Sequence, residues 1–190
     1  MRKKTAFFVI LFSCTTLFSI AQFYKTSRTD NSFADSLTKI VYDFKQNFYP
    51  IQGKQLTSQV MADVYQSNVG IPGAAHCIIQ RYHSEEDTTA SWQAIMFEGE
   101  QYEEALKIYT NTIKQIKKTK LKLGESTHGT FTGEIEKPDE SASFTVTPLR
   151  LDIADRDYKY FYAEVEIINN YDGWEVHLNL HNKKNDEEQY

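Results

Sequence analysis

The sequence contains few cysteines, and this scarcity limits how the fold can be stabilised. Only Cys14 and Cys77 occur among the 190 residues. Because Cys14 lies in an N-terminal segment that we expect to be removed, Cys77 would be the single thiol of the mature chain. One thiol cannot form an internal disulfide, so stability must come from a hydrophobic core. The apolar run Ala75–Ile79 around Cys77 predicts a strand that buries an unreactive thiol.

Motifs of known catalytic chemistry are also missing. The chain has no G-x-S-x-G elbow, no H-E-x-x-H helix, no P-loop and no dinucleotide-binding glycine pattern. It also has no internal repeat, and no pair of carboxylates can be placed across a cleft. We therefore expect no catalytic residue, no cofactor and no metal. These absences favour a non-catalytic protein, while an enzyme of an unrecognised type stays open.

Positive charge is scarce as well. Removal of residues 1–21 takes away three of the 21 basic residues and none of the 26 acidic ones, so the mature net charge is −8. Such a chain is not a general nucleic-acid binder, because phosphate backbones require basic surfaces. Anionic membrane surfaces are excluded for the same reason, except through a local patch. One basic patch exists, and the charge preference of a helix C-terminus explains it: Lys114, Lys117, Lys118, Lys120 and Lys122.

The N-terminus has the pattern of an export signal. Basic residues in Met1–Lys4 precede an apolar segment that continues to Ile20, and Ser19 and Ala21 supply the small residues that signal peptidase requires. This pattern predicts a signal peptide over residues 1–21 and a periplasmic or secreted protein that begins at Gln22. Two alternatives stay open. The segment could be an uncleaved anchor, or Cys14 could be lipidated, which would be the only route to membrane attachment of the mature chain.

Helices are indicated by apolar residues that recur on one helical face. The first begins at a capping box formed by Ser32 and Asp35 and ends before Pro50. The second covers about residues 99–118, with acidic residues at its start and lysines at its end. A shorter helix is predicted over residues 56–66.

Strands are indicated by alternating apolar and polar residues. A pair is predicted at residues 74–82 and 91–97, and a C-terminal meander turns at Asn170–Gly173. Because proline cannot donate a ladder hydrogen bond, Pro148 predicts a bulge or an edge position. The sequence therefore predicts one α+β domain over residues 22–190. Its antiparallel twisted sheet would have about five strands, with two to three helices packed on one face.

The last hairpin carries the candidate binding residues. Two registers bring its apolar residues together, one opposing Glu166 to His177 and the other opposing Glu164 to His177, so either register places a glutamate beside the imidazole. The residues predicted to share this face are Tyr160, Tyr162, Glu164, Glu166, His177 and Asn179. They could bind a ligand or a partner, or they could be the solvated outer face of a sheet.

Metal binding is not expected on this hairpin. His177 and His181 would lie about 13 Å apart along one strand, which is too far to share a metal directly. Three aspartates gather at the turn before the hairpin, but they lack the EF-hand glycine and distal glutamate: Asp152, Asp155 and Asp157.

Three functional hypotheses follow. The first is an exported, non-catalytic protein that binds an unidentified protein or small molecule through the hairpin face. The second is an exported, hydrolase-like enzyme that uses one of its histidines as the base: His76, His83, His128 or His177. The third is a lipid-anchored envelope subunit, which depends on the fate of Cys14.

Overall fold

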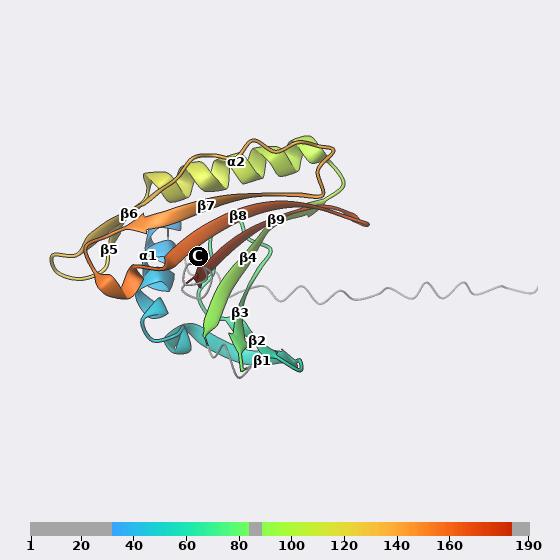
Figure 1. The fold of residues 1–190 in the computed structure, drawn as a ribbon. Helices are drawn as coiled ribbons and strands as arrows, with labels where there is room; N and C mark the ends of the chain where they lie inside the picture. Colours follow the sequence, from blue (N-terminus) through green and yellow to red (C-terminus); the bar gives the residue numbers. More distant parts are fainter. Residues whose placement is uncertain (1–31, 84–88, 184–190) are drawn as a thin grey trace, which may run out of the picture.

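One antiparallel sheet organises the chain. The computed structural model describes residues 32–83 and 89–183, so the predicted signal peptide and Cys14 lie outside the described residues. Within the described part of the chain, nine strands form a single sheet in the order β1-β2-β3-β4-β9-β8-β7-β6-β5. The sheet is strongly bent, and helix α2 lies along the strands β7, β8 and β9 (Figure 1).

The sheet is built from two runs of consecutive antiparallel strands, each preceded by a helix. Helix α1 and the 3₁₀ helix η1 precede the first run: Phe33–Phe44, Tyr49–Ile51, then β1 Gln52–Ser58, β2 Ala62–Ser67, β3 His76–Tyr82 and β4 Ala90–Gly99. Helix α2 precedes the second run, which includes the 3₁₀ helix η2: Tyr102–Lys118, then β5 Lys120–Lys122, β6 His128–Thr132, β7 Phe144–Asp152, η2 Arg156–Tyr158, β8 Phe161–Asn170 and β9 Gly173–Asn182. The last strands of the two runs, β4 and β9, pair with each other in the middle of the sheet.

The α+β class and the antiparallel pairing are confirmed, whereas the prediction of about five strands is wrong. The additional strands lie toward the two edges of the sheet, where β1 and β2 form one edge and β5 and β6 the other. Apolar and polar residues alternate only weakly in these strands, because a strand near the edge of a sheet buries few side chains. In β1, for example, residues 54–58 are all exposed.

The predicted helix over residues 56–66 is also wrong, because this segment forms the hairpin of β1 and β2. The apolar residues that suggested a helical face do not share a buried surface. Leu56, Val60 and Met61 lie near the hairpin tip and are 41%, 95% and 60% exposed, whereas Tyr65 packs against the hydrophobic core. The backbone amide of Gln59 donates to the carbonyl of Ala62 and closes the turn.

Helix α1 begins as predicted and ends earlier. The Ser32 hydroxyl accepts a hydrogen bond from the backbone N–H of Asp35, at 3.2 Å. The helix stops at Phe44 because Asn47 and Phe48 adopt positive φ angles of 52° and 60°. This left-handed turn reverses the chain and places the Phe48 side chain in the core.

Both helices contribute to one hydrophobic core with the sheet. Trp92 of β4 is completely buried, and its indole N–H donates to the buried Ser67 hydroxyl at 2.9 Å. Tyr109 of α2 is also fully buried, and its hydroxyl lies 2.5 Å from the Thr147 hydroxyl on β7. Cys77 is 1% exposed, and burial raises the pKa of its thiol to about 11, as expected for an unreactive cysteine.

The hairpin of β8 and β9 has the first of the two predicted registers, with Glu166 opposite His177. Its two-residue turn ends at Gly173, whose φ of 132° favours glycine. Pro148 of β7 lies beyond the last residue that pairs with β6, so of the two alternatives the edge position is correct, and no register shift occurs there.

Candidate functional site

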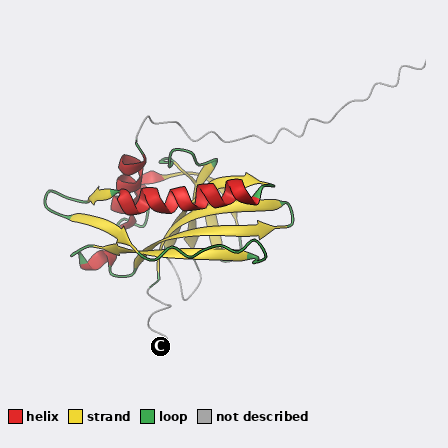
Figure 2. Cartoon of the chain, turned by 90° about the horizontal axis from the view of Figure 1, so that it is seen from above, coloured by secondary structure: helices red, strands yellow, loops and turns green. Residues whose placement is uncertain are grey.

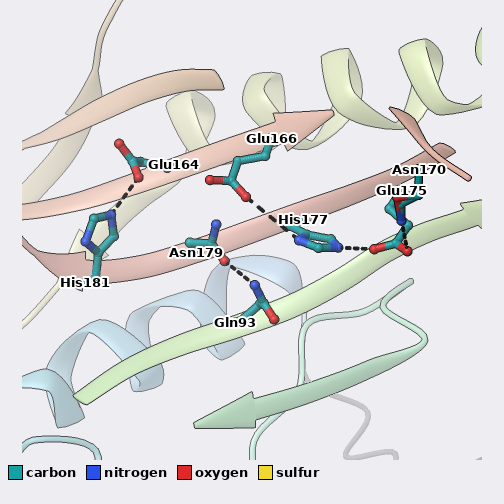
Figure 3. Close-up of polar contacts among 8 residues, drawn as sticks. All are labelled: Gln93, Glu164, Glu166, Asn170, Glu175, His177, Asn179 and His181. Atoms are coloured by element: carbon teal, nitrogen blue, oxygen red, sulfur yellow. Dashed lines mark hydrogen bonds and ion pairs between the residues drawn. The ribbon is translucent and has the colours of Figure 1, made fainter. Parts of the chain in front are cut away.

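Polar side chains project from the face of the sheet that turns away from the helices. Alternate residues of β8 and β9 pack into the core, and the residues between them form this outer surface. Figure 3 shows α1 and α2 behind the sheet and the polar side chains in front of it. We call the eight residues drawn there the polar face: Gln93, Glu164, Glu166, Asn170, Glu175, His177, Asn179 and His181.

Glu164 has two basic partners. His181 Nε2 lies 2.8 Å from Glu164 Oε2, and Lys183 Nζ lies 2.5 Å from Glu164 Oε1. The Glu164 side chain is only 12% exposed. Burial raises the pKa of this carboxyl, but the hydrogen bonds from His181 and Lys183 together outweigh burial, so its pKa lies below the usual value. The carboxylate therefore stays charged at neutral pH.

His177 lies between two carboxylates. Its Nε2 is 2.6 Å from Glu175 Oε2, its Nδ1 is 3.8 Å from Glu166 Oε2, and its side chain is 13% exposed. Glu175 also accepts a hydrogen bond from the Asn170 amide. Burial raises the pKa of Glu175, but hydrogen bonds from Asn170 and His177 lower it to below its usual value. The hydrogen bond with Glu175 thus orients the imidazole ring, and Glu166 lies on the other side of the ring (Figure 3).

The polar face extends across β9 to β4. The Gln93 amide donates to Asn179 Oδ1 at 2.8 Å. Two rows further along the same pair of strands, past the pair Ile95 and His177, Glu98 lies directly opposite Glu175. Like charges in directly opposed positions destabilise a sheet. This surface carries four carboxylates, whereas, among the described residues, the basic groups in contact with them number three. These basic groups are Lys183, His177 and His181.

The structure brings most of the predicted site residues together. Glu164, Glu166, His177 and Asn179 belong to the polar face, and Tyr162 lies opposite His181 at its end. Tyr160 precedes β8, where its hydroxyl accepts from Lys159 Nζ at 2.6 Å. These placements describe geometry, and the binding role assigned to the residues stays a prediction.

The candidate histidine bases do not gather at one site. His76 lies on β3, on the outer face of the sheet, and its Coulombic interaction with Glu175 contributes to lowering the pKa of that carboxyl. His83 follows β3, with its Nε2 3.9 Å from Asp63 Oδ1. His128 is exposed on β6 at the other edge. Only His177 combines low exposure with close polar partners.

Four residues of the polar face were not among the predicted binding residues, namely Gln93, Asn170, Glu175 and His181. Glu175 and Asn170 could have been found, since both lie in the predicted hairpin and the alternation places Glu175 beside His177. Gln93 could not, because its contact with Asn179 joins residues 86 positions apart.

Metal and membrane signals are weak in the part of the chain that the structure describes. No group of three or more His, Cys, Asp or Glu side chains is arranged there to hold a metal ion. No helix in the same residues is sufficiently long and apolar to span a membrane. In the turn after β7, the carboxylates of Asp155 and Asp157 form salt bridges with Lys45 Nζ, at 2.5 Å and 2.9 Å. Both side chains are therefore engaged in a structural ion pair.

Comparison of the chain with protein-family models, curated proteins and solved structures found no match.

Proposed function

We propose that this protein is an exported, non-catalytic binding protein whose polar face docks a basic segment of a partner protein. The observation that carries the proposal is the excess of carboxylates on this surface. Glu98, Glu164, Glu166 and Glu175 share it, and Lys183 is the permanently charged cation among their contacts. A cationic side chain inserted between Glu98 and Glu175 would relieve their repulsion, which makes a basic partner favourable.

An apolar flank beside the polar face supports a peptide or protein partner. Phe144 of β7 pairs with Ile168 of β8, and Val146 pairs with Glu166. Phe144 is 66% exposed although it is a large aromatic residue. Exposed aromatic side chains next to charged groups are typical of protein interfaces. A segment that carries both basic and apolar residues would fit this combination.

The state of the candidate nucleophiles and bases supports binding over catalysis. The thiol of Cys77 is buried with a raised pKa, so it is a poor nucleophile. His177 and His181 each have a ring nitrogen within hydrogen-bond distance of a glutamate of the same face. A base in such a position orients its neighbours, and within the described residues neither ring is hydrogen-bonded to a hydroxyl or thiol nucleophile.

We expect the mature chain to bind a synthetic peptide of alternating lysine and leucine residues, and to bind a glutamine–leucine peptide at least tenfold more weakly. Isothermal titration would give both affinities, and amide NMR shifts should locate the peptide on β4, β8 and β9. Because the attraction would be between solvent-exposed charges, which salt screens, the affinity for the peptide should fall as the salt concentration is raised.

Charge-neutralising variants test which surface is responsible. The triple variant Glu98→Gln, Glu166→Gln, Glu175→Gln should bind the basic peptide at least tenfold more weakly. A control with the same change in charge uses exposed positions elsewhere: Glu104→Gln, Glu125→Gln and Glu134→Gln. Equal losses in the two variants would show attraction to net charge alone and would refute docking on the polar face, as would the absence of saturable binding.

The export part of the proposal concerns residues 1–21. We expect expression in a bacterial host with its own signal peptidase to yield a mature protein that begins at Gln22. Intact-mass and N-terminal peptide mass spectrometry measure this directly. A chain that begins at a lipid-modified Cys14 would replace the proposal with an envelope-anchored protein, and an intact Met1 in the soluble cytoplasmic fraction would refute export.

A further inference from the structure

A second candidate site lies at the edge of the sheet formed by β5, β6 and β7, next to the Tyr162 end of the polar face. Two shallow hollows adjoin the segment Asp152–Ala154, where β7 ends and the chain turns into η2. Their volumes are about 380 Å³ and about 370 Å³. Figure 1 shows this end of the molecule, with β5, β6 and the short helix η2 close together, and Figure 2 shows the same edge from above.

Basic side chains outnumber acidic ones in the lining of the first hollow. The first hollow is lined by Arg150, Arg156 and Lys159, and the second by Lys120 and His128. Two acids also contribute, but they are not equivalent: Asp155 is held by Lys45, whereas Asp152 has no ion pair with a described residue. The first hollow therefore has a small excess of positive charge on a chain whose overall charge is −5.

The two guanidinium groups of the first hollow are available for a ligand. Within residues 32–83 and 89–183, neither Arg150 nor Arg156 forms a side-chain hydrogen bond or an ion pair. An arginine side chain presents five N–H donors in a planar fork that matches a carboxylate or a phosphate. Two such forks that line one concave surface are suited to one anionic group.

The wall of the first hollow is held in place before any ligand arrives. Asp155 binds Lys45 and also accepts the backbone N–H of Asp157 at 3.0 Å, which caps η2. Tyr158 is 1% exposed and packs against Phe44 and Phe161. Its buried hydroxyl has no hydrogen-bond partner in the described structure. A wall fixed by packing and ion pairs reduces the entropy that a ligand would have to overcome.

We propose that the hollow between Arg150 and Arg156 binds a small molecule through a carboxylate or phosphate group. Arg150 is carried by a strand and Arg156 by η2, so the two donors approach the anion from different elements. This site adjoins the polar face, because Arg150 lies directly opposite Tyr162, but it offers basic groups where the polar face offers carboxylates.

The test uses the mature chain with inorganic phosphate and citrate as probes, each titrated at constant ionic strength against chloride. At least one probe should raise the melting temperature saturably, because a ligand that binds only the folded state stabilises it. A rise in melting temperature with phosphate alone would identify phosphate esters as the ligand class, and a rise with citrate alone would identify carboxylates.

The double variant Arg150→Gln, Arg156→Gln should weaken the effective probe at least tenfold. Lys114→Gln, Lys118→Gln is the control, because it removes the same charge from exposed positions on α2. Circular dichroism would verify that both variants fold. The proposal fails if neither probe gives a saturable shift, if the control loses as much affinity, or if the folded double variant binds as tightly as the parent.

Discussion

Replacing Trp92 with alanine is expected to destabilise the protein by about 3–5 kcal/mol, the range for truncating a buried aromatic residue. Trp92 is the largest fully buried side chain, and it sits on β4 in the core between the sheet and the helices. The truncation also removes the donor to Ser67, whose hydroxyl is buried too. Because single domains are stable by only about 5–15 kcal/mol, this loss removes a large part of the total.

Urea denaturation followed by far-UV circular dichroism would measure the loss. Trp92→Phe keeps most of the ring volume but not the N–H donor, so it should lie between the parent and the alanine variant. Tyr171→Ala is the matched control, since Tyr171 is fully exposed at the tip of the last hairpin and should change the free energy of unfolding by less than about 0.5 kcal/mol. Equal effects of Trp92→Ala and Tyr171→Ala would contradict the assignment of Trp92 to the core.

The two long helices could be predicted because each needs only local information. Ser32 and Asp35 define one start, and the apolar residues of each helix repeat at helical spacing. The end of α1 could not be predicted. It depends on Asn47 and Phe48 in a left-handed turn, which Phe48 adopts because its ring is then buried. A bulky residue at positive φ is stabilised by tertiary contacts that a local pattern does not contain.

The last hairpin could be predicted and the first could not, for related reasons. In β8 and β9 one side of each strand is buried, so the alternation is clean and restricts the register to two choices. In the hairpin of β1 and β2 the apolar residues near the tip, such as Val60, are exposed, and the turn contains no glycine or proline. Its sequence therefore resembles an amphipathic helix.

The candidate sites show the same division between local and distant contacts. Glu166 and His177 could be paired from the hairpin alone. The opposition of Glu98 and Glu175 depends on the pairing of β4 with β9 and on the register shift between Ile95 and Phe97. The hollow near Arg150 requires η2 to fold back beside β7, and no pattern in the sequence fixes that position.

Acid is expected to remove the stabilisation that Glu164 contributes. The folded-state pKa of this carboxyl lies below its usual value because hydrogen bonds from His181 and Lys183 outweigh the effect of burial. A group whose pKa is depressed by folding stabilises the protein fully above the unfolded-state pKa, about 4.3 for glutamate. The stabilisation is lost as the pH falls through the lower folded-state pKa.

Glu164→Gln separates this charge effect from packing, because glutamine has nearly the same shape. At pH 7 the variant should be less stable by about 1–3 kcal/mol, since Lys183 and His181 lose a buried charged acceptor. The difference between parent and variant should begin to shrink as the pH falls below the unfolded-state pKa of about 4.3, and it should be lost once the pH passes the lower folded-state pKa of the parent carboxyl.

Urea midpoints measured from pH 7 to pH 3 would test this, with the exposed Glu134→Gln as the control. A difference that stays constant over this range would assign the role of Glu164 to packing. A difference that vanishes in acid would show that Glu164 acts as a charge, which is the property that a basic partner on the polar face requires.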